Sequence, residues 1–256
     1  MPATHRAVTL TALSGIPAVQ PGDDVAAILA DALDAGAMAP RDRDVLVVTH
    51  KIISNAEGRY RSLADVTPSP RARQLAAATG KDPALVEVIL SESRQVVRSR
   101  RELIITEHCS GMVMANAGID QSNVPGGSER VLLLPENPDA SSAALRTALG
   151  ARFGVDIAVV VSDSVGRAWR NGVVGLALGA AGLPALQDLR GRNDLEGRAL
   201  KVTQVGLADE IASAAELLMG EADEGRPAVL VRGVQWCEAP VAAAALIRDR
   251  QQDLFR

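Results

Sequence analysis

The chain has 256 residues, of which 47% are hydrophobic and 23% charged, so it can bury a substantial core and is not disordered. A formal net charge of −4 gives no electrostatic case for nucleic-acid binding, and the sequence contains neither a signal-peptide core nor an uncharged apolar span of about 18 residues. Cys109 and Cys237 are too few for a disulfide framework and lack a zinc-site spacing, so we expect a cytoplasmic protein without a membrane partner.

Apolar runs and turn signals predict interleaved helices and strands along the chain. Pro21–Asp24 predicts a turn that offers an N-cap to an amphipathic helix over Asp24–Asp34. The next expected elements are a strand at Val45–Val48, helical sequence from Pro68 to about Ser93 with breaks near Gly80 and Pro83, and strands at Leu103–Glu107 and Val131–Leu134. Later come a helix at Asp139–Phe153, a strand at Asp156–Ser162, a helix at Ala208–Gly220 with Ile211, Leu217 and Leu218 inward, a strand at Ala228–Val231 and a closing helix at Val241–Phe255.

This order of elements predicts a mixed α/β or α+β fold, with residues 1–256 forming one domain that has room for two closely associated lobes. The stretch from 94 to 135 does not fit a βαβ unit, so we do not predict a Rossmann sheet. Pro125–Ser128 is the best candidate for a flexible loop tip. The small apolar residues of Gly172–Leu183 suit either the core or a buried interface.

Several common catalytic patterns are absent from the sequence. The Gly80-Lys81 pair is followed by aspartate and does not form a P-loop, and the glycines at 175, 179 and 182 lack the spacing of a dinucleotide-binding loop. None of the three histidines forms a metal-binding or catalytic pair by spacing, and no nucleophile elbow accompanies them.

Hard oxygen ligands follow two of the expected strands instead. The polar run Asn116–Asn123, which contains Asp120, lies downstream of the strand at Leu103–Glu107, and Asp163-Ser164 comes directly after the strand at Asp156–Ser162. Two carboxylates and a hydroxyl suit a Mg²⁺ or Mn²⁺ nucleotide site. The alternative is that each aspartate only caps a turn or helix after its strand.

Other polar residues allow both a functional and a structural interpretation. Lys51 and Arg59 flank a turn after a strand and could hold phosphate, but Ser54–Glu57 also has the pattern of a capping box. Gly15–Pro17 could form an anion-binding nest or an ordinary turn. Glu221 follows a helix end and is either a ligand or simply exposed.

Five segments in a fixed order make the chain recognisable. They are Gly15–Pro17, Lys51–Arg59, Asn116–Asn123, Ser162–Gly172 and Ala208–Glu221. Together they resemble the coenzyme F420-0:L-glutamate ligase family, also called F420:γ-glutamyl ligase, from about residue 8 to 235. The resemblance implies a two-lobed fold with mixed sheets, specific to that family, and a homodimer. From the 256-residue length we expect no fused C-terminal oxidoreductase domain of the kind that some relatives carry.

The resemblance also implies a reaction. The expected activity is GTP-dependent addition of L-glutamate to F420-0, and of further γ-linked glutamates, through an acyl phosphate, which forms an amide bond and releases GDP and phosphate. Expected cofactors are two Mg²⁺ or Mn²⁺ ions, with a monovalent cation such as K⁺ as a further expectation. Such chemistry relies on positioning and charge neutralisation and needs no catalytic nucleophile. The alternatives are a different carboxylate acceptor at the same site, or a metal-nucleotide binding protein without turnover.

Position by position, the resemblance assigns site residues. Asp120 and Asp163 are the expected ligands of a first divalent ion, and Ser164 and Glu221 those of a second. Expected nucleotide contacts are Leu13, Ser14, Gly15, Ile16, His50, Asn55, Asn123, Met219 and Gly220, and expected phosphate or substrate contacts are Lys51, Arg59, Arg167 and Arg170.

The chain departs from its relatives at residues 50 and 55. Family members commonly carry Ser or Gln where this chain has His50, and a nucleotide-binding Lys where it has Asn55; Lys51 is the nearby residue that could compensate. Ser164 stands where Thr is frequent, and Ala168 where Pro is frequent.

Overall fold

The structure is a computed structural model that describes residues 6–122 and 127–255. Its α-helices are α1 (Val25–Ala35), α2 (His50–Ala56), α3 (Pro70–Thr79), α4 (Pro83–Ser91), α5 (Pro138–Phe153) and α6 (Leu207–Met219). Its strands are β1 (Thr9–Ala12), β2 (Val45–Thr49), β3 (Tyr60–Ser62), β4 (Ser93–Arg100), β5 (Leu103–His108), β6 (Val113–Ala115), β7 (Arg130–Leu132), β8 (Ala158–Arg167), β9 (Arg170–Ala181), β10 (Gln187–Asp188), β11 (Gln204–Val205) and β12 (Ala228–Arg232). Short 3-10 turns are η1 (Leu63–Asp65), η2 (Asn116–Gly118), η3 (Gly127–Glu129), η4 (Ala243–Leu246) and η5 (Arg250–Gln252).

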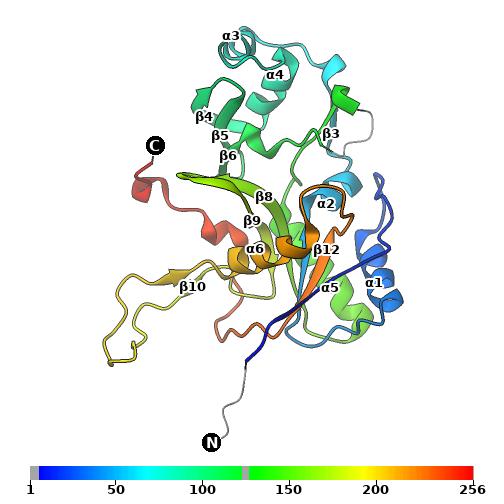
Figure 1. The fold of residues 1–256 in the computed structure, drawn as a ribbon, viewed down its shortest axis with the longest axis vertical. Coiled ribbons are helices and arrows are strands. Elements are labelled where there is room, and N and C mark those ends of the chain that lie inside the picture. The colour runs from blue at the N-terminus through cyan, green and yellow to red at the C-terminus, as the bar shows by residue number, and fades with distance from the viewer. Residues whose placement is uncertain (1–5, 123–126, 256) are drawn as a thin grey trace, which may run out of the picture.

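A five-stranded sheet with the order β1-β12-β2-β8-β9 forms the larger lobe (Figure 1). Strands β2 and β8 are parallel, and the other neighbouring pairs are antiparallel. The mixed sheet confirms the expected α+β class and differs from the all-parallel sheet of a Rossmann fold.

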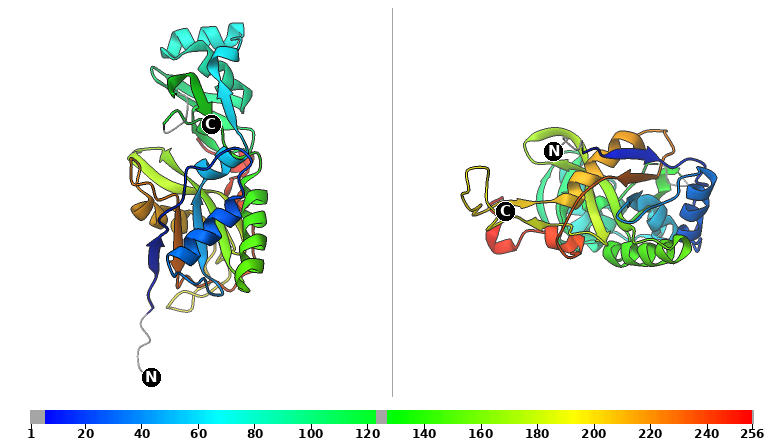
Figure 2. Two further views of the ribbon diagram at one scale, coloured as in Figure 1. Left: turned by 90° about the vertical axis from the view of Figure 1, so that its right-hand side faces the viewer. Right: turned by 90° about the horizontal axis from the view of Figure 1, so that it is seen from below.

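Both faces of this sheet are covered, which explains why its central strands are apolar throughout. Side chains alternate between the faces of a strand, so Leu46 and Val48 enter one core while Val45 and Val47 enter the other. Helices α1 and α5 pack on the first face and α6 packs on the second (Figure 2). Double coverage produces the unbroken valine-rich run of a buried strand instead of alternation with polar residues.

The smaller lobe consists of α3, α4, the β3-β7 pair and the antiparallel sheet β4-β5-β6, at the top of Figure 1. Its own core includes Val86, Ile89 and Ile104. A small apolar cluster joins the lobes, because Met114 packs with Val165 of β8. The molecule is therefore two-lobed, as expected, with an arm that carries β10 and β11 extending from the larger lobe.

Many predicted boundaries are confirmed by the capping interactions that set them. The Asp24 carboxylate accepts the backbone N–H of Ala27 and caps α1. Gly80, with a φ of 74°, ends α3, and Pro83 begins α4 two residues after Lys81. The strand expected at Val131–Leu134 is shorter and lies at β7.

The expected closing helix at Val241–Phe255 is wrong. Within residues 241–255, all described by the structure, only η4 and η5 form. Val241 pairs with Pro184 as an isolated bridge, and the Asp139 carboxylate accepts the backbone N–H of Ala243 at 2.9 Å and of the next residue at 3.2 Å. Because tertiary partners take these donors, the alanine-rich segment does not form the i to i−4 bonds of a helix.

Two further expectations need correction. The strand expected to end before Asp163 continues to Arg167, because β9, formed largely by Gly172–Leu183, pairs with it in a long hairpin. In α6, Ile211 is buried as expected, but Leu217 is 82% exposed, because Met219 and neighbouring alanines take the inward positions.

Within the described residues, no helix combines the length and the apolar character needed to cross a membrane.

Candidate functional site

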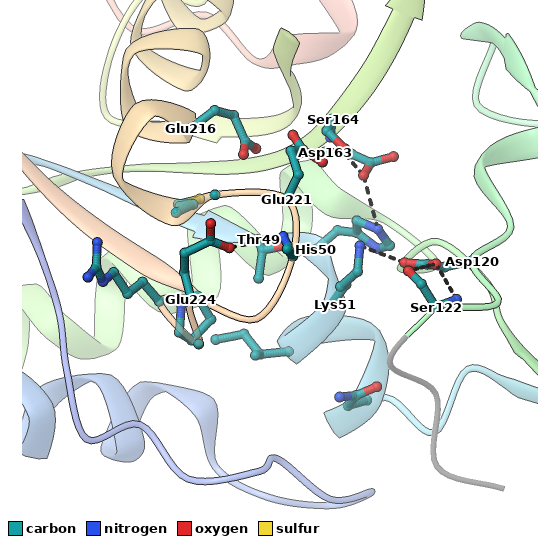
Figure 3. A pocket seen from close by; sticks show the side chains of 18 of the residues that line it. Thr49, His50, Lys51, Asp120, Ser122, Asp163, Ser164, Glu216, Glu221 and Glu224 are labelled. Atoms are coloured by element: carbon teal, nitrogen blue, oxygen red, sulfur yellow. Dashed lines mark hydrogen bonds and ion pairs between the residues drawn. The ribbon is translucent and has the colours of Figure 1, made fainter. Parts of the chain in front are cut away.

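A cleft of about 700 Å³ lies where the two lobes meet. The larger lobe contributes the segments 16–19, 163–166 and 216–227, and the smaller lobe contributes residues between Met114 and Ser122. Helix α2 forms the remaining wall. Figure 3 shows carboxylates from several of these segments around one space.

Strand pairing places His50 beside Asp163. Strands β2 and β8 are parallel with Thr49 opposite Ser162, so the next residue of each strand lies at the same edge of the sheet. There His50 Nε2 lies 3.4 Å from Asp163 Oδ1, while its Nδ1 lies 3.2 Å from the hydroxyl oxygen of Ser54. His50, one of the two positions where this chain departs from its relatives, is only 1% exposed and forms part of the cleft wall. Its contact with Asp163 orients that carboxylate.

Asp120 reaches the cleft from the smaller lobe. Its backbone N–H and C=O both bond to Leu132, next to β3 in the β3-β7 pair. One carboxylate oxygen accepts hydrogen bonds from the backbone and hydroxyl of Ser122, and the other lies 2.5 Å from Lys51 Nζ. The turn-capping interpretation thus holds for one oxygen, and the second oxygen faces the cleft.

The Lys51 ammonium controls the charge state of this pair. Burial favours the neutral acid of Asp120, but the hydrogen bond and charge of Lys51, with the bonds from Ser122, outweigh burial and lower the pKa of Asp120. Burial likewise lowers the pKa of Lys51, but Asp120, Asp163 and Glu221 more than compensate and raise it. Both groups are therefore ionised near neutral pH.

The end of α6 contributes two carboxylates. Gly220 ends the helix with a φ of 73°, a backbone conformation that favours glycine because L side chains rarely adopt it. Glu221 follows directly and lines the cleft, as does Glu216 from the last turn of the helix. Burial and the charges of Glu221 and Asp163 raise the pKa of Glu216 to about 7.

The structure brings most of the expected site residues together. Those lining the cleft are Ile16, His50, Lys51, Asn55, Asp120, Asp163, Ser164, Met219, Gly220 and Glu221. Leu13 is instead a fully buried core residue, and the exposed Ser14 and Gly15 do not line the cleft. Asn123 lies outside the described residues.

Three expected arginine contacts are elsewhere. The Arg59 guanidinium donates to the Leu134 carbonyl at 2.9 Å and to the Glu92 carboxylate at 3.0 Å, which ties α2 to the smaller lobe. Arg167 and Arg170 lie at the tip of the β8-β9 hairpin, beyond the residues that line the cleft.

The capping-box interpretation of Ser54–Glu57 is wrong. Helix α2 begins at His50, so Ser54 lies inside it, and Glu57 ends it and accepts hydrogen bonds from Glu136 and Ser141. At Asn55, the amide oxygen accepts a hydrogen bond from the Tyr60 hydroxyl at 2.9 Å.

The donor set fits the expected divalent ions. Carboxylate and hydroxyl oxygens are the ligands that Mg²⁺ and Mn²⁺ prefer. Among residues 6–122 and 127–255, no three acidic, histidine or cysteine side chains already form a closed metal-binding group. The cation in this position is the Lys51 ammonium, which interacts with Asp120, Asp163 and Glu221 and shows that the cleft stabilises positive charge.

Sequence reasoning missed Glu216. Within α6 it lies one helical turn after the buried Ala212 and one residue after the buried Ala215, at the edge of an apolar face. An acidic residue at the edge of an apolar helix face is the one sequence signal that could have indicated a site residue at 216. The sequence analysis instead selected Met219, Gly220 and Glu221, which follow it.

Comparison with known proteins gives consistent results over nearly the whole chain. The family model described as F420-0:Gamma-glutamyl ligase matches residues 15–233. The coenzyme F420:L-glutamate ligase of Methanopyrus kandleri is 49% identical over 242 residues, which is 93% of each chain. The protein with the same name from Methanothermobacter thermautotrophicus is 43% identical over 251 residues, 97% of this chain and 99% of the relative. That from Haloarcula marismortui is 41% identical over 252 residues, 96% of this chain and 94% of the relative.

Proposed function

Because this chain belongs to the F420-0:gamma-glutamyl ligase family, we propose that it attaches L-glutamate to coenzyme F420-0 and uses GTP to drive the reaction. The observation that carries the proposal is the cleft in which Asp120, Asp163, Ser164 and Glu221 converge from both lobes. These are the positions that sequence resemblance assigns to two metal ions. Bound Mg²⁺ or Mn²⁺ ions would neutralise the charge of the nucleotide phosphates there.

The residues of the chain then bind and orient the substrates. We assign the nucleotide to the side of the cleft lined by Ile16 and by the segment from Met219 to Pro227. Lys51, freed from Asp120 when an ion takes its place, is positioned to contact a phosphate oxygen. His50 is held by Ser54 and keeps the Asp163 carboxylate in place.

The proposed reaction has two steps. An F420-0 carboxylate oxygen attacks the γ-phosphorus of GTP, which forms an acyl phosphate and releases GDP. The amine of L-glutamate then attacks the acyl carbon, loses a proton and expels phosphate, which leaves an amide. Neither step needs a protein nucleophile, because holding the reactants in line supplies most of the acceleration.

Mass spectrometry of the product tests this function. The purified protein is incubated with F420-0, L-glutamate, GTP and Mn²⁺, and Asp163→Asn serves as the matched inactive variant. We expect product masses increased by one or more glutamate residues with the unaltered protein only, together with GDP and phosphate. Absence of any glutamate addition while the protein still binds GDP would contradict the proposal. Phosphate release with a different carboxylate acceptor would assign the same site to another substrate.

We also propose a homodimer, by resemblance. The aromatic pair of Trp169 and Phe255 at the β8-β9 tip is a candidate contact, since these side chains are 81% and 56% exposed and their ring centroids are 4.8 Å apart. Light scattering should give twice the chain mass, and Trp169→Ser should reduce that mass if this pair lies in the interface.

A further inference from the structure

We propose that Glu216, which the family resemblance did not assign, is a further ligand of the second divalent cation, the one assigned above to Ser164 and Glu221. This inference rests on the proposed function for the presence of two ions. With Glu216, the ligands of this ion would come from three segments: Ser164 from β8, Glu216 from α6 and Glu221 from the loop after α6.

The first argument is the direction of the side chain. Glu216 lines the cleft, and Figure 3 shows its carboxylate on the same side of the space as Glu221 and Ser164. The carboxylate is close enough to Glu221, Asp163 and Lys51 for their charges to act on it. The Glu216 carboxylate therefore interacts with one residue assigned to each ion, Asp163 and Glu221.

The second argument is a close contact between α6 and β9 that fixes this position. Ser164 on β8 pairs with Gly175 on β9, and a Cβ at Gly175 would lie 2.6 Å from Cγ of Glu216 and 2.5 Å from the carbonyl oxygen of Ala212. The Ser213 hydroxyl donates to the Gly175 carbonyl at 2.7 Å, which pins the helix at the same place. Glycine at 175 thus lets the Glu216 stem lie against the strand residue opposite Ser164.

The third argument is that the carboxylate has no partner. Throughout the described part of the chain, no hydrogen bond or ion pair reaches the Glu216 carboxylate, although it is about half buried beside other acids. Burying an unpaired carboxylate is costly, and the charges of Glu221 and Asp163 increase that cost. A divalent cation at Ser164 and Glu221 would remove the cost and would gain a third oxygen donor from the protein.

The test counts bound Mn²⁺ in the presence of GDP by the electron paramagnetic resonance signal of the free ion. We expect two bound ions in the unaltered protein. In Glu216→Gln, one ion should bind about tenfold more weakly or be lost, while the other, held by Asp120 and Asp163, keeps its affinity. The matched control is Glu210→Gln, which removes an exposed carboxylate from the same helix and should bind both ions normally.

A second variant tests the packing that positions Glu216. Gly175→Ala should push α6 away from β9 and weaken the same ion, with helical content unchanged by circular dichroism. If Gly175→Ala lowers the helical content, Glu216→Asp takes its place: it shortens the side chain by one methylene without touching the strand and should give an affinity between those of the unaltered protein and Glu216→Gln.

The outcomes separate this inference from the proposed function. Binding of both ions with unaltered affinity by Glu216→Gln would overturn the role of Glu216, even if the protein ligates glutamate. Selective loss of one ion would support it, even if F420-0 proves not to be the acceptor. An unaltered protein that binds fewer than two ions would overturn both the inference and the proposed two-metal site.

Discussion

The ammonium nitrogen of Lys51 lies 2.5 Å from a carboxylate oxygen of Asp120, and the charges of Asp163 and Glu221 also act on it. A lysine therefore occupies the region where the proposed reaction requires metal ions. In the proposed two-metal site, an ion bound by Asp120 would displace this ammonium.

Lys51→Met should make the metal-free protein less stable and Mn²⁺ binding tighter. Removal of the ammonium leaves the carboxylates to repel one another, which we expect to cost about 1 kcal/mol because the pair is partly exposed. Without a competing cation, Mn²⁺ alone should bind roughly fivefold more tightly, as measured by titration without nucleotide. Lys201→Met, which removes an exposed lysine, is the control. Unchanged Mn²⁺ affinity in Lys51→Met would show that the ammonium does not compete with the ion.

Asn55→Lys should strengthen nucleotide binding. Asn55 lines the cleft but is neutral, and its amide oxygen is engaged by the Tyr60 hydroxyl. A lysine at this position adds a positive charge beside the proposed phosphate site, so GDP should bind roughly fivefold more tightly, about 1 kcal/mol. Fluorescence titration with a labelled GDP measures the change. Asn193→Lys adds the same charge on the distant arm and should leave the affinity unaltered; equal affinities for both variants would argue against phosphate near Asn55.

Glu92 should contribute stability that depends on pH. The His108 imidazole, whose Nε2 lies 3.8 Å from a Glu92 carboxylate oxygen, lowers the pKa of Glu92; burial opposes this, and the charge of Arg59 adds to the lowering. A carboxyl group whose folded pKa is depressed contributes stability above its unfolded value of 4.5, and that contribution is lost as the pH falls through the lower folded pKa.

Glu92→Gln should therefore reduce the free energy of unfolding by about 1–2 kcal/mol near pH 7 and have a much smaller effect near pH 3. Urea unfolding of both proteins at the two pH values measures the difference. A difference that is the same at both values would mean that packing, and not the charge of Glu92, is responsible.

The pair of Asp44 and Arg232 should be the most sensitive ion pair of the larger lobe. Asp44 is 2% exposed at the start of β2, and both Nε and Nη2 of Arg232, at the end of β12, donate to its carboxylate. Arg232→Met leaves that buried charge without its guanidinium partner, which we expect to cost about 3–5 kcal/mol. Denaturant unfolding measures the loss. Arg198→Met breaks the exposed pair with Asp194 and should cost less than about 1 kcal/mol; equal losses would contradict the importance of burial.

The local elements could be predicted from the sequence because their signals are local. Apolar runs identified β2, β8 and β12, and the cap at Asp24 and the stop at Gly220 set the ends of α1 and α6. Strand β9 was not recognised because Gly175 and Gly179 weaken the strand signal. The structure explains both glycines by close approach: α6 packs on the first, and Pro138 at the start of α5 packs on the second.

The site depended on pairings that the sequence does not encode locally. The parallel register of β2 and β8 places His50 beside Asp163. The placement of one lobe on the other brings Asp120 to Lys51. The alanine-rich end of the chain failed as a helix for the same reason, since the Asp139 carboxylate, about 100 residues earlier, takes its backbone donors. Family resemblance supplied Asp120, Asp163, Ser164 and Glu221 as a set, and the fold brings all four to one cleft.

Diffraction at the manganese absorption edge, from crystals grown with GDP and Mn²⁺, tests the two-metal nucleotide site most directly. We predict two anomalous peaks in the cleft, one between Asp120 and Asp163 and one beside Ser164, Glu221 and Glu216, with GDP along the loop after Gly220. GDP bound in another part of the molecule, or bound in the cleft without any anomalous peak at these carboxylates, would contradict the proposed site.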